Sequence, residues 1–588
     1  MGITAVKKFF FAAITLILTS PFALSFIFAQ EVKLEKIVVE KNNASSVIQN
    51  ADYFTKEEIQ SFPFSSCEEI VDYSSSVNLK KRSNFGIQQD VSIRGSIFED
   101  ANISLAGVKI NDPQTGHFSL EIPLTSADLD GIEIRQNTQR INFTPKKPDA
   151  KGFLLKNSFG QYALWENLMS INFPLLEAKN RLSIEHKISK GSRRDTDFEI
   201  YNFSYHYLWE TEASDTEFLF GLTKRDFGAD SFYSSRFTQE EEHTEQKFFL
   251  GRLGLNADFF KLNNTVYLRR HRDKYILNRA NPSFYTNYHT TYVYGLKQEF
   301  DFYNDLFAAL NIEQEKIDST NLSKHYRLRK GLSLGLKEKE FGKFIFGLSA
   351  GTDYYDKWEY LENGHLGAGY FLNDNLKLRF SFDHIWRAPS FTELYYSDPA
   401  NAGNPNLGIQ KSNNFETGFD FLPSKTLSFS PSFFFRNQSN TIDWVKNNSA
   451  DRWKAKNVGS VNAYGLDFFS KYQFKNCVLD NISLGYTYLN LEKESPYSYS
   501  KYVFDYDRHK VVTNFGFNYK GFRTNLISNF SKPVDREKYV TFDVKAEKQI
   551  RNFTLALEGT NIFNESYEEM KDIDGSKRWY KLSVAYTF

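Results

Sequence analysis

The residues best suited to chemistry in this sequence are two groups of aspartates. Asp195 and Asp197 lie in the run Arg193-Arg-Asp-Thr-Asp197, and Asp226 and Asp230 follow further along the chain. Calcium takes about six to eight oxygen ligands, which carboxylates supply. If the two groups meet in the fold, these four residues could hold a calcium ion. Three neighbouring arginines favour ordinary ion pairs instead: Arg193, Arg194 and Arg225.

No other arrangement of residues predicts catalysis or a resident cofactor. Serines, histidines and acids are scattered without the motif of an activated nucleophile, and no glycine-rich phosphate loop is present. The two cysteines, Cys67 and Cys477, predict neither a disulfide framework nor a zinc site. The 72 basic and 72 acidic residues balance, so no basic excess favours nucleic acid. We expect a protein that is not an enzyme.

From Gly152 to the end of the chain, alternating strand-like segments of about ten residues recur. The run Leu376–Asp383 places its apolar residues on one face and Lys, Arg, Ser and Asp on the other. The terminal run Lys581–Phe588 alternates in the same way and can pair with the first strand of a closed sheet. Only a closed sheet satisfies its backbone groups in lipid. Aromatic residues make up 17% of the sequence, which is high. Outer-membrane barrels carry girdles of aromatic residues at both membrane interfaces, so this content favours such a barrel.

These observations predict an all-β fold: residues 151–588 form an antiparallel transmembrane β-barrel. At roughly twenty residues per strand and connection, its length gives about 22 strands. The alternative is a soluble, secreted β-rich enzyme or lectin, because periodicity alone does not distinguish lipid from a core. Short turns such as Leu422–Lys425 alternate with long polar loops that we expect outside the cell. Those loops are Phe227–Gln246, Arg272–His289, Tyr395–Asn414 and Glu492–Arg508.

The first 29 residues predict a signal peptide. Lys7 and Lys8 precede the apolar stretch Phe9–Phe28, and Ala29 is a small residue suited to cleavage. The apolar stretch is also long enough for a membrane anchor, but Pro21 near its centre favours cleavage. We therefore expect an exported chain without a spanning helix.

Residues 47–150 predict a small α+β domain ahead of the barrel. Thr55 and Glu58 have the spacing of a helix-capping box. Strand-like runs follow at Asp90–Arg94, Ile103–Ile110 and Ile132–Ile134, before the proline-containing break at 144–149. A small domain preceding so large a barrel suggests a plug inside the lumen.

Several motifs carry a resemblance to a known family. Val91-Ser-Ile-Arg-Gly95 with Leu105–Asp112, the block Arg387–Gly418, and Gly559–Tyr567 together resemble the plug and barrel signatures of TonB-dependent outer-membrane receptors, most of all the cobalamin-receptor-like group. The resemblance identifies residues 31–46 as a TonB box and linker. The box that would couple to TonB comprises Leu34, Glu35, Lys36, Ile37, Val38, Val39 and Glu40.

The resemblance implies an active-transport receptor in the outer membrane of a Gram-negative-type cell. It implies uptake of a scarce, bulky nutrient, with cobalamin or another corrinoid first and a ferric siderophore or haem second. Expected partners are TonB with its inner-membrane energising complex, membrane lipid and the small-molecule nutrient, and the expected state is a monomer. The glycine-rich plug segment expected after Arg135 is missing. A passive porin or an adhesion-type receptor therefore remains the alternative.

Substrate is expected to meet the outer side of the plug and the long loops. The plug candidates are Asn111, Asp112, Gln114 and His117. The loop candidates are aromatic, with packing in the loops or girdles as the alternative: Phe232, Tyr233, Tyr395 and Tyr396.

Overall fold

The computed structural model describes residues 51–588, apart from 234–236, 504 and 572, and all of these belong to one compact unit, Lys41–Phe588. The predicted signal peptide (residues 1–29) and the predicted TonB box (Leu34–Glu40) lie outside the described residues. Within the described part of the chain, no helix has the length and apolar character to cross a membrane.

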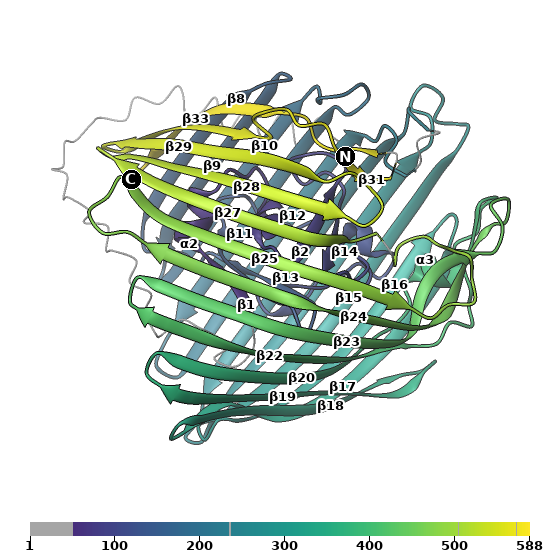
Figure 1. Cartoon of the computed structure of the whole chain (residues 1–588), viewed down its shortest axis with the longest axis horizontal. Coiled ribbons are helices and arrows are strands. Elements are labelled where there is room, and N and C mark those ends of the chain that lie inside the picture. Colours follow the sequence, from purple (N-terminus) through teal and green to yellow (C-terminus); the bar gives the residue numbers. More distant parts are fainter. Residues whose placement is uncertain (1–50, 234–236, 504, 572) are drawn as a thin grey trace. The chain divides into compact units, whose positions relative to one another are not determined.

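The larger part of the described chain is a closed antiparallel barrel of 22 strands, as expected (Figure 1). Two further two-residue strands in the loops, β21 (Asn401–Ala402) and β26 (Tyr499–Ser500), extend the sheet at the rim of the barrel. The first eleven barrel strands are β8 (Gly152–Gly160), β9 (Leu164–Leu175), β10 (Ala178–Ser189), β11 (Phe198–Glu210), β12 (Ser214–Gly228), β13 (Glu241–Asn256), β14 (Phe260–Ile276), β15 (Thr286–Phe302), β16 (Leu306–Ser319), β17 (Ser323–Phe341) and β18 (Phe344–Tyr355). The other eleven are β19 (Glu359–Asn373), β20 (Leu376–Arg387), β22 (Gln410–Ser424), β23 (Leu427–Lys446), β24 (Trp453–Gln473), β25 (Leu479–Lys493), β27 (Asp507–Tyr519), β28 (Phe522–Pro533), β29 (Tyr539–Ile550), β30 (Phe553–Thr560) and β33 (Trp579–Thr587).

The alternation along each strand decides which side chains face outward. In β20, Phe380 is 40% exposed on the outer surface, whereas its neighbour Arg379 is 4% exposed inside the barrel. The last strand, β33, pairs antiparallel with the first, β8, as the alternating C-terminus predicted. Backbone hydrogen bonds between Phe153 and Phe588 complete the closure, at 2.9 and 3.1 Å. The ring therefore leaves no open sheet edge.

The two ends of the barrel differ in their connections. At one end, which we name the turn end, short turns join strands, such as residues 342–343 between β17 and β18. At the other end, the loop end, lie long connections such as 229–240 and 388–409. The latter contains the short helix α3 (Phe391–Tyr395), and residues 561–578 contain the hairpin β31 (Glu568–Met570) and β32 (Ile573–Asp574). Long polar loops thus gather at one end, where the sequence predicted them.

A smaller domain lies inside the barrel (Figure 1), and we refer to it as the plug. Its five-stranded sheet has the order β1-β6-β7-β4-β5. The strands are β1 (Ala51–Thr55), β6 (Leu129–Arg135), β7 (Arg140–Pro145), β4 (Asn102–Leu105) and β5 (Val108–Lys109). The other elements are α2 (Lys56–Ser61), the 3₁₀ helices η1 (Cys67–Tyr73) and η2 (Gly116–Phe118), and the hairpin β2 (Val77–Lys81) with β3 (Gln89–Ile93). Its core is apolar and includes the fully buried Ile103, Leu105, Ile132, Ile134 and Phe143.

Local sequence signals explain two features of the plug. Thr55 caps α2 and Glu58 completes the predicted capping box. Strand β7 follows β6 after a tight turn at 136–139, and Arg135 pairs directly with Arg140 across it. The turn ends on Gln139 in the left-handed region, at φ 53°. A short hairpin therefore occupies the place where the resemblance implies a longer glycine-rich segment.

Candidate functional site

Buried ion pairs fix the plug to one part of the barrel wall. Arg94, in the left-handed region at φ 47°, reaches Glu416 on β22 and Asp467 on β24, both at 2.6 Å. Its guanidinium also lies 4.1 Å from the centre of the Phe434 ring. Because all three charged side chains are at most 7% exposed, losing any one would leave an uncompensated charge in the interior.

Four more ion pairs extend this contact around the barrel. They join Asp128 to Arg181 on β10 (2.6 Å), Glu68 to Arg225 on β12 (3.0 Å), Asp112 to Arg269 on β14 (2.7 Å), and Asp72 to Lys510 on β27 (2.8 Å). We name the strands that carry these partners, β10, β12, β14, β22, β24 and β27, the anchored wall. A plug held by so many desolvated pairs has a defined register in the lumen.

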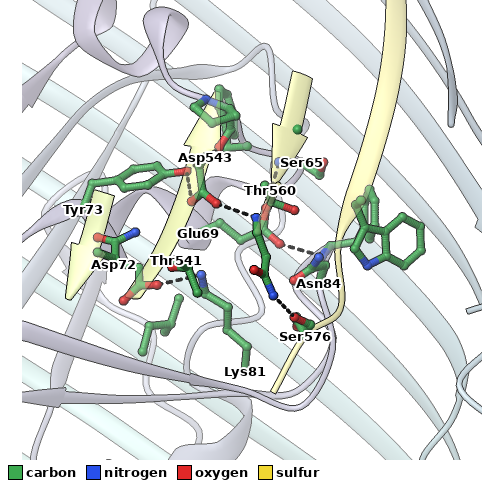
Figure 2. Close-up of a pocket in the computed structure, with 18 of the residues that line it drawn as sticks. Ser65, Glu69, Asp72, Tyr73, Lys81, Asn84, Thr541, Asp543, Thr560 and Ser576 are labelled. Atoms are coloured by element: carbon green, nitrogen blue, oxygen red, sulfur yellow. Dashed lines mark hydrogen bonds and ion pairs between the residues drawn. The ribbon is translucent and has the colours of Figure 1, made fainter. Parts of the chain in front are cut away.

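A small polar pocket lies between the plug and strands β28–β33 (Figure 2). It has a volume of about 80 Å³. Tyr73 of the plug donates to Asp543 of β29 at 3.3 Å, and Lys81 pairs with Asp72 at 2.7 Å. Asn561 donates its backbone N–H to Asp543 at 2.8 Å and its amide to the Ser576 carbonyl at 3.0 Å. The side chains around this pocket largely satisfy one another, so the pocket belongs to the plug–wall contact.

A far larger cavity, of about 830 Å³, lies between the plug and strands β16–β20, and we name β16–β19 the cavity wall. On the plug side it is lined by Lys109 of β5 and by Arg135, Thr138 and Arg140 of the β6–β7 hairpin; Asn111 and Asp112 also reach it. On the wall side its lining includes Arg327, Arg329, Gly347, Ser349, Asp353 and Tyr355. A volume of this size suits a small-molecule ligand.

The long loop 388–409 folds over the outer surface of the plug beside this cavity. The backbone N–H groups of Phe391 and Thr392 donate to the Pro113 and Gln114 carbonyls, at 2.9 and 3.0 Å. At the end of β20, Arg387 pairs with Asp100 at 2.9 Å and with Glu393 at 2.7 Å. The loop and the plug thus meet at the outer mouth of the cavity.

The four predicted plug candidates lie in two places. Asn111 and Asp112 line the cavity, but the Asp112 carboxylate is fully buried against Arg269. Burial acts to raise the pKa of Asp112, and Arg269 and His271 outweigh it, so the pKa lies below its usual range. Gln114 is buried, and His117 contacts Asp90 at 2.6 Å while stacking on Phe98. Asp112, Gln114 and His117 are thus occupied within the protein.

The four predicted aromatic candidates separate into two loop clusters. Phe232 is fully buried, and the Tyr233 hydroxyl donates to Gln88 of the plug at 2.8 Å. Tyr395 stacks on His325 with ring centres 3.6 Å apart. Tyr395 and Tyr396 both pack against a buried apolar cluster that includes Phe391 and Trp444. In this structure they hold the loops together, which is the alternative that the sequence left open.

The four aspartates proposed for calcium lie on neighbouring segments but do not form a metal-binding group. Arg279 binds Asp197 at 2.6 Å and Asp195 at 3.4 Å, whereas Asp226 contacts Lys224 and His243. The Ser231 hydroxyl donates to Asp230. Among the described residues no group of three or more His, Cys, Asp or Glu could hold a metal ion. The calcium hypothesis is corrected, because basic side chains occupy three of these carboxylates.

The cavity residues were missed by the sequence reasoning. Lys109, Arg140, Arg327 and Arg329 were not singled out, although Arg327 and Arg329 alternate along one strand. Alternating charges on the inner face of a barrel strand were the available signal, because inner faces of such barrels are polar. That signal finds lumen-facing residues but does not show which of them border a void.

Comparisons with known proteins agree with this architecture. The family model "TonB-dependent Receptor Plug Domain" matches residues 43–147, and "TonB dependent receptor-like, beta-barrel" matches residues 137–562. The chain is 21% identical to the vitamin B12 transporter BtuB of Photobacterium profundum, over 95% of this chain and 96% of that protein.

Two solved structures share the fold. The FrpB iron transporter of Neisseria meningitidis has a TM-score of 0.77 at 12% identity, with 92% of this chain and 100% of that chain covered. The siderophore receptor PirA of Acinetobacter baumannii has a TM-score of 0.76 at 13% identity, with 92% and 98% covered. Because the two family models together span the plug and most of the barrel, this chain belongs to the TonB-dependent receptor family.

Proposed function

We propose that this receptor takes up cobalamin or another corrinoid by TonB-coupled transport across the outer membrane. The observation that carries the proposal is the similarity to a vitamin B12 transporter along nearly the whole of both chains. A plug domain within a barrel of this size is suited to a bulky solute that must not diffuse freely. A ferric siderophore or haem is the second substrate class, and the fold alone supports it.

In this proposal, residues 1–29 direct export and are removed, residues 31–46 supply the TonB box and linker, and a monomer spans the membrane. Force applied to the TonB box would reach the plug at β1, which is an edge strand of the plug sheet and, within the described part of the chain, pairs with β6 alone. Ala51 pairs with Arg135, beside the hairpin that borders the cavity. Pulling would therefore act first on the plug edge next to the cavity.

The test is deletion of Leu34–Glu40, with labelled cyanocobalamin supplied to cells that carry the full-length receptor. Binding at the surface should be unchanged, and uptake should fall to background. A matched deletion of residues 41–46, which keeps the box, controls for shortening of the N-terminal segment. Normal uptake without the box contradicts the proposed coupling to TonB. Absence of cyanocobalamin binding by the native receptor contradicts the proposed substrate.

A passive porin is the second candidate function, favoured by the cavity beside the plug. Single-channel conductance of the full chain and of a chain without residues 31–150 separates the two. A receptor gated by the plug conducts little until the plug is removed, whereas a porin conducts at a similar level in both.

A further inference from the structure

The cavity exists because both of its sides are recessed. On the plug side, the β6–β7 hairpin ends in its short turn at 136–139. On the wall side, the positions of β17–β19 that face the lumen are small over a long stretch. Those positions are Gly331, Ser333 and Gly335 of β17, Gly347, Ser349 and Gly351 of β18, and Gly367 of β19, and they are neighbours in the strand register.

The cavity runs along the wall rather than across it. Its lining on β18 begins at Gly347, near the turn end, and continues to Tyr355, the last residue at the loop end. At ~3.4 Å per residue this stretch measures about 27 Å. Trp386 and Ser390 line the mouth at the loop end, and Leu336 and Glu338 line the other extreme. A solute in the cavity would therefore lie along much of the barrel height.

Most charges around the cavity are neutralised by partners. On the wall, Arg327 pairs with Glu315, and Arg329 contacts Glu313 at 3.2 Å and Asp353 at 3.4 Å. At the mouth, burial and the neighbouring Glu393 raise the pKa of Glu99 to about 8, so this carboxyl is mainly neutral at pH 7. The two wall arginines thus face three carboxylates, which leaves one negative charge in excess on the wall.

Lys109 and Arg140 differ from the other cavity charges. Both line the cavity from the plug side, and neither has an ion-pair partner among the described residues. The Lys109 side chain is exposed to the cavity, and the buried Nε of Arg140 has no hydrogen-bond acceptor. A buried donor without an acceptor costs free energy until a ligand supplies one. The charge that the plug presents to the cavity is therefore positive, and it faces the one excess carboxylate of the wall.

We propose that this cavity binds an anionic group of the transported solute, and that Lys109 and Arg140 hold that group against the plug. A phosphodiester or a carboxylate fits the chemistry, because a guanidinium binds either with paired hydrogen bonds and an ammonium adds a point charge. Tyr355 and Trp386 offer aromatic surface at the mouth for the rest of the solute. The inference rests on the proposed uptake function and names the substrate class as an organic anion.

Thiol chemistry tests this proposal on the purified full-length protein. Ser349→Cys places a thiol on the cavity wall, in a Cys477→Ser background because Cys477 is the exposed cysteine. The thiol is treated with an anionic reagent, sulfonatoethyl methanethiosulfonate, and with a cationic one, trimethylammonioethyl methanethiosulfonate. The ratio of the two rates is compared with the same ratio for Cys477 in the native chain.

We expect the anionic reagent to be favoured by roughly tenfold relative to Cys477, as in other charged clefts. Lys109→Gln combined with Arg140→Gln should return the ratio to that of Cys477. Removing the same charge at the exposed Lys147 and Lys151, by Lys147→Gln with Lys151→Gln, should leave it unchanged. A thiol that reacts with neither reagent, or a preference that survives the Lys109 and Arg140 substitutions, overturns the proposal.

Two probes distinguish the kinds of anion. Pyrophosphate should slow modification of the Ser349→Cys thiol if the site favours phosphate, and citrate should do so if it favours carboxylates. Protection by neither overturns the binding claim. None of these measurements needs TonB, so the site can fail while TonB-dependent uptake stands, and uptake can fail while the site stands.

Discussion

The anchored wall and the cavity wall meet the same plug in opposite ways. On the anchored wall, basic and acidic side chains of the strands are neutralised by plug residues, as Glu416 and Asp467 are by Arg94. On the cavity wall, glycines and serines withdraw from the plug, and Arg327 and Arg329 pair with residues of their own wall. The difference shows that ion pairs hold the plug over much of the ring and that space borders it at β16–β19.

This asymmetry has a consequence for movement. Breaking a buried ion pair exposes two charges to an apolar environment, whereas widening a cavity that already exists breaks no such pair. The strand β1, through which force would arrive, begins beside Arg135 at the cavity. Solute passage is therefore expected along the cavity wall, with the anchored wall as the fixed side.

The largest expected effect comes from removing an anchor. Arg94→Leu leaves Asp467 buried without its cation, while Glu416 keeps Arg379 at 3.4 Å, and the change should destabilise the docked plug by about 3–5 kcal/mol. The matched substitution on the cavity side, Arg140→Leu, removes a charge without a partner and should change stability by less than about 1 kcal/mol. Hydrogen exchange of the plug amides in the full-length protein measures both. Equal losses would remove the distinction between the walls.

A smaller effect is expected from filling the cavity. Ser349→Trp places a large side chain in the space between β18 and the plug, so uptake should fall roughly tenfold. The control is Leu334→Trp, on the lipid-facing side of the neighbouring strand β17, where Leu334 is 54% exposed and does not line the cavity. Uptake and surface binding of the labelled nutrient are measured in both variants. Unimpaired uptake in Ser349→Trp would show that the solute takes another path.

The smallest effect concerns pH at the cavity mouth. Because the folded pKa of Glu99 is raised to about 8, its carboxyl becomes anionic as pH rises through that value. The protonated Glu99 carboxyl therefore contributes to the stability of the folded protein. That contribution is fully present near pH 4.5 and is lost as the pH rises to about 8. The added negative charge should lower the anionic preference of the Ser349→Cys thiol by about twofold between pH 7 and 9. Taking the ratio of the two reagents cancels the titration of the thiol, and Glu99→Gln should abolish the fall.

Much of the fold followed from patterns that depend only on local sequence. The alternation of Leu376–Asp383 predicted which residues face lipid, and the alternating C-terminus predicted the pairing of β33 with β8. The spacing of Thr55 and Glu58 predicted the start of α2. These features succeed because strand alternation and helix capping act over a few residues.

The site could not be predicted in the same way, because it depends on pairs that are distant in sequence. Asp112 looked accessible in a polar loop, yet Arg269 of β14 neutralises it inside the barrel. Asp195 and Asp197 have side chains suited to a metal ion, but Arg279 of another loop pairs with both in the folded chain. Lys109 and Arg140 matter through the partners they lack, which no short motif encodes. The small residues facing the lumen on β17 and β18 were the visible signal of the cavity.

The central claim, that solvent and solute reach one wall and not the other, has one direct measurement. Ser349→Cys on the cavity wall and Ser183→Cys on the anchored wall, where Ser183 is fully buried, are each placed in the Cys477→Ser background. Both full-length proteins are treated with the anionic thiol reagent without TonB. The account predicts rapid modification of the Ser349→Cys protein and protection of the Ser183→Cys protein. Protection of both, or equal modification of both, would contradict it.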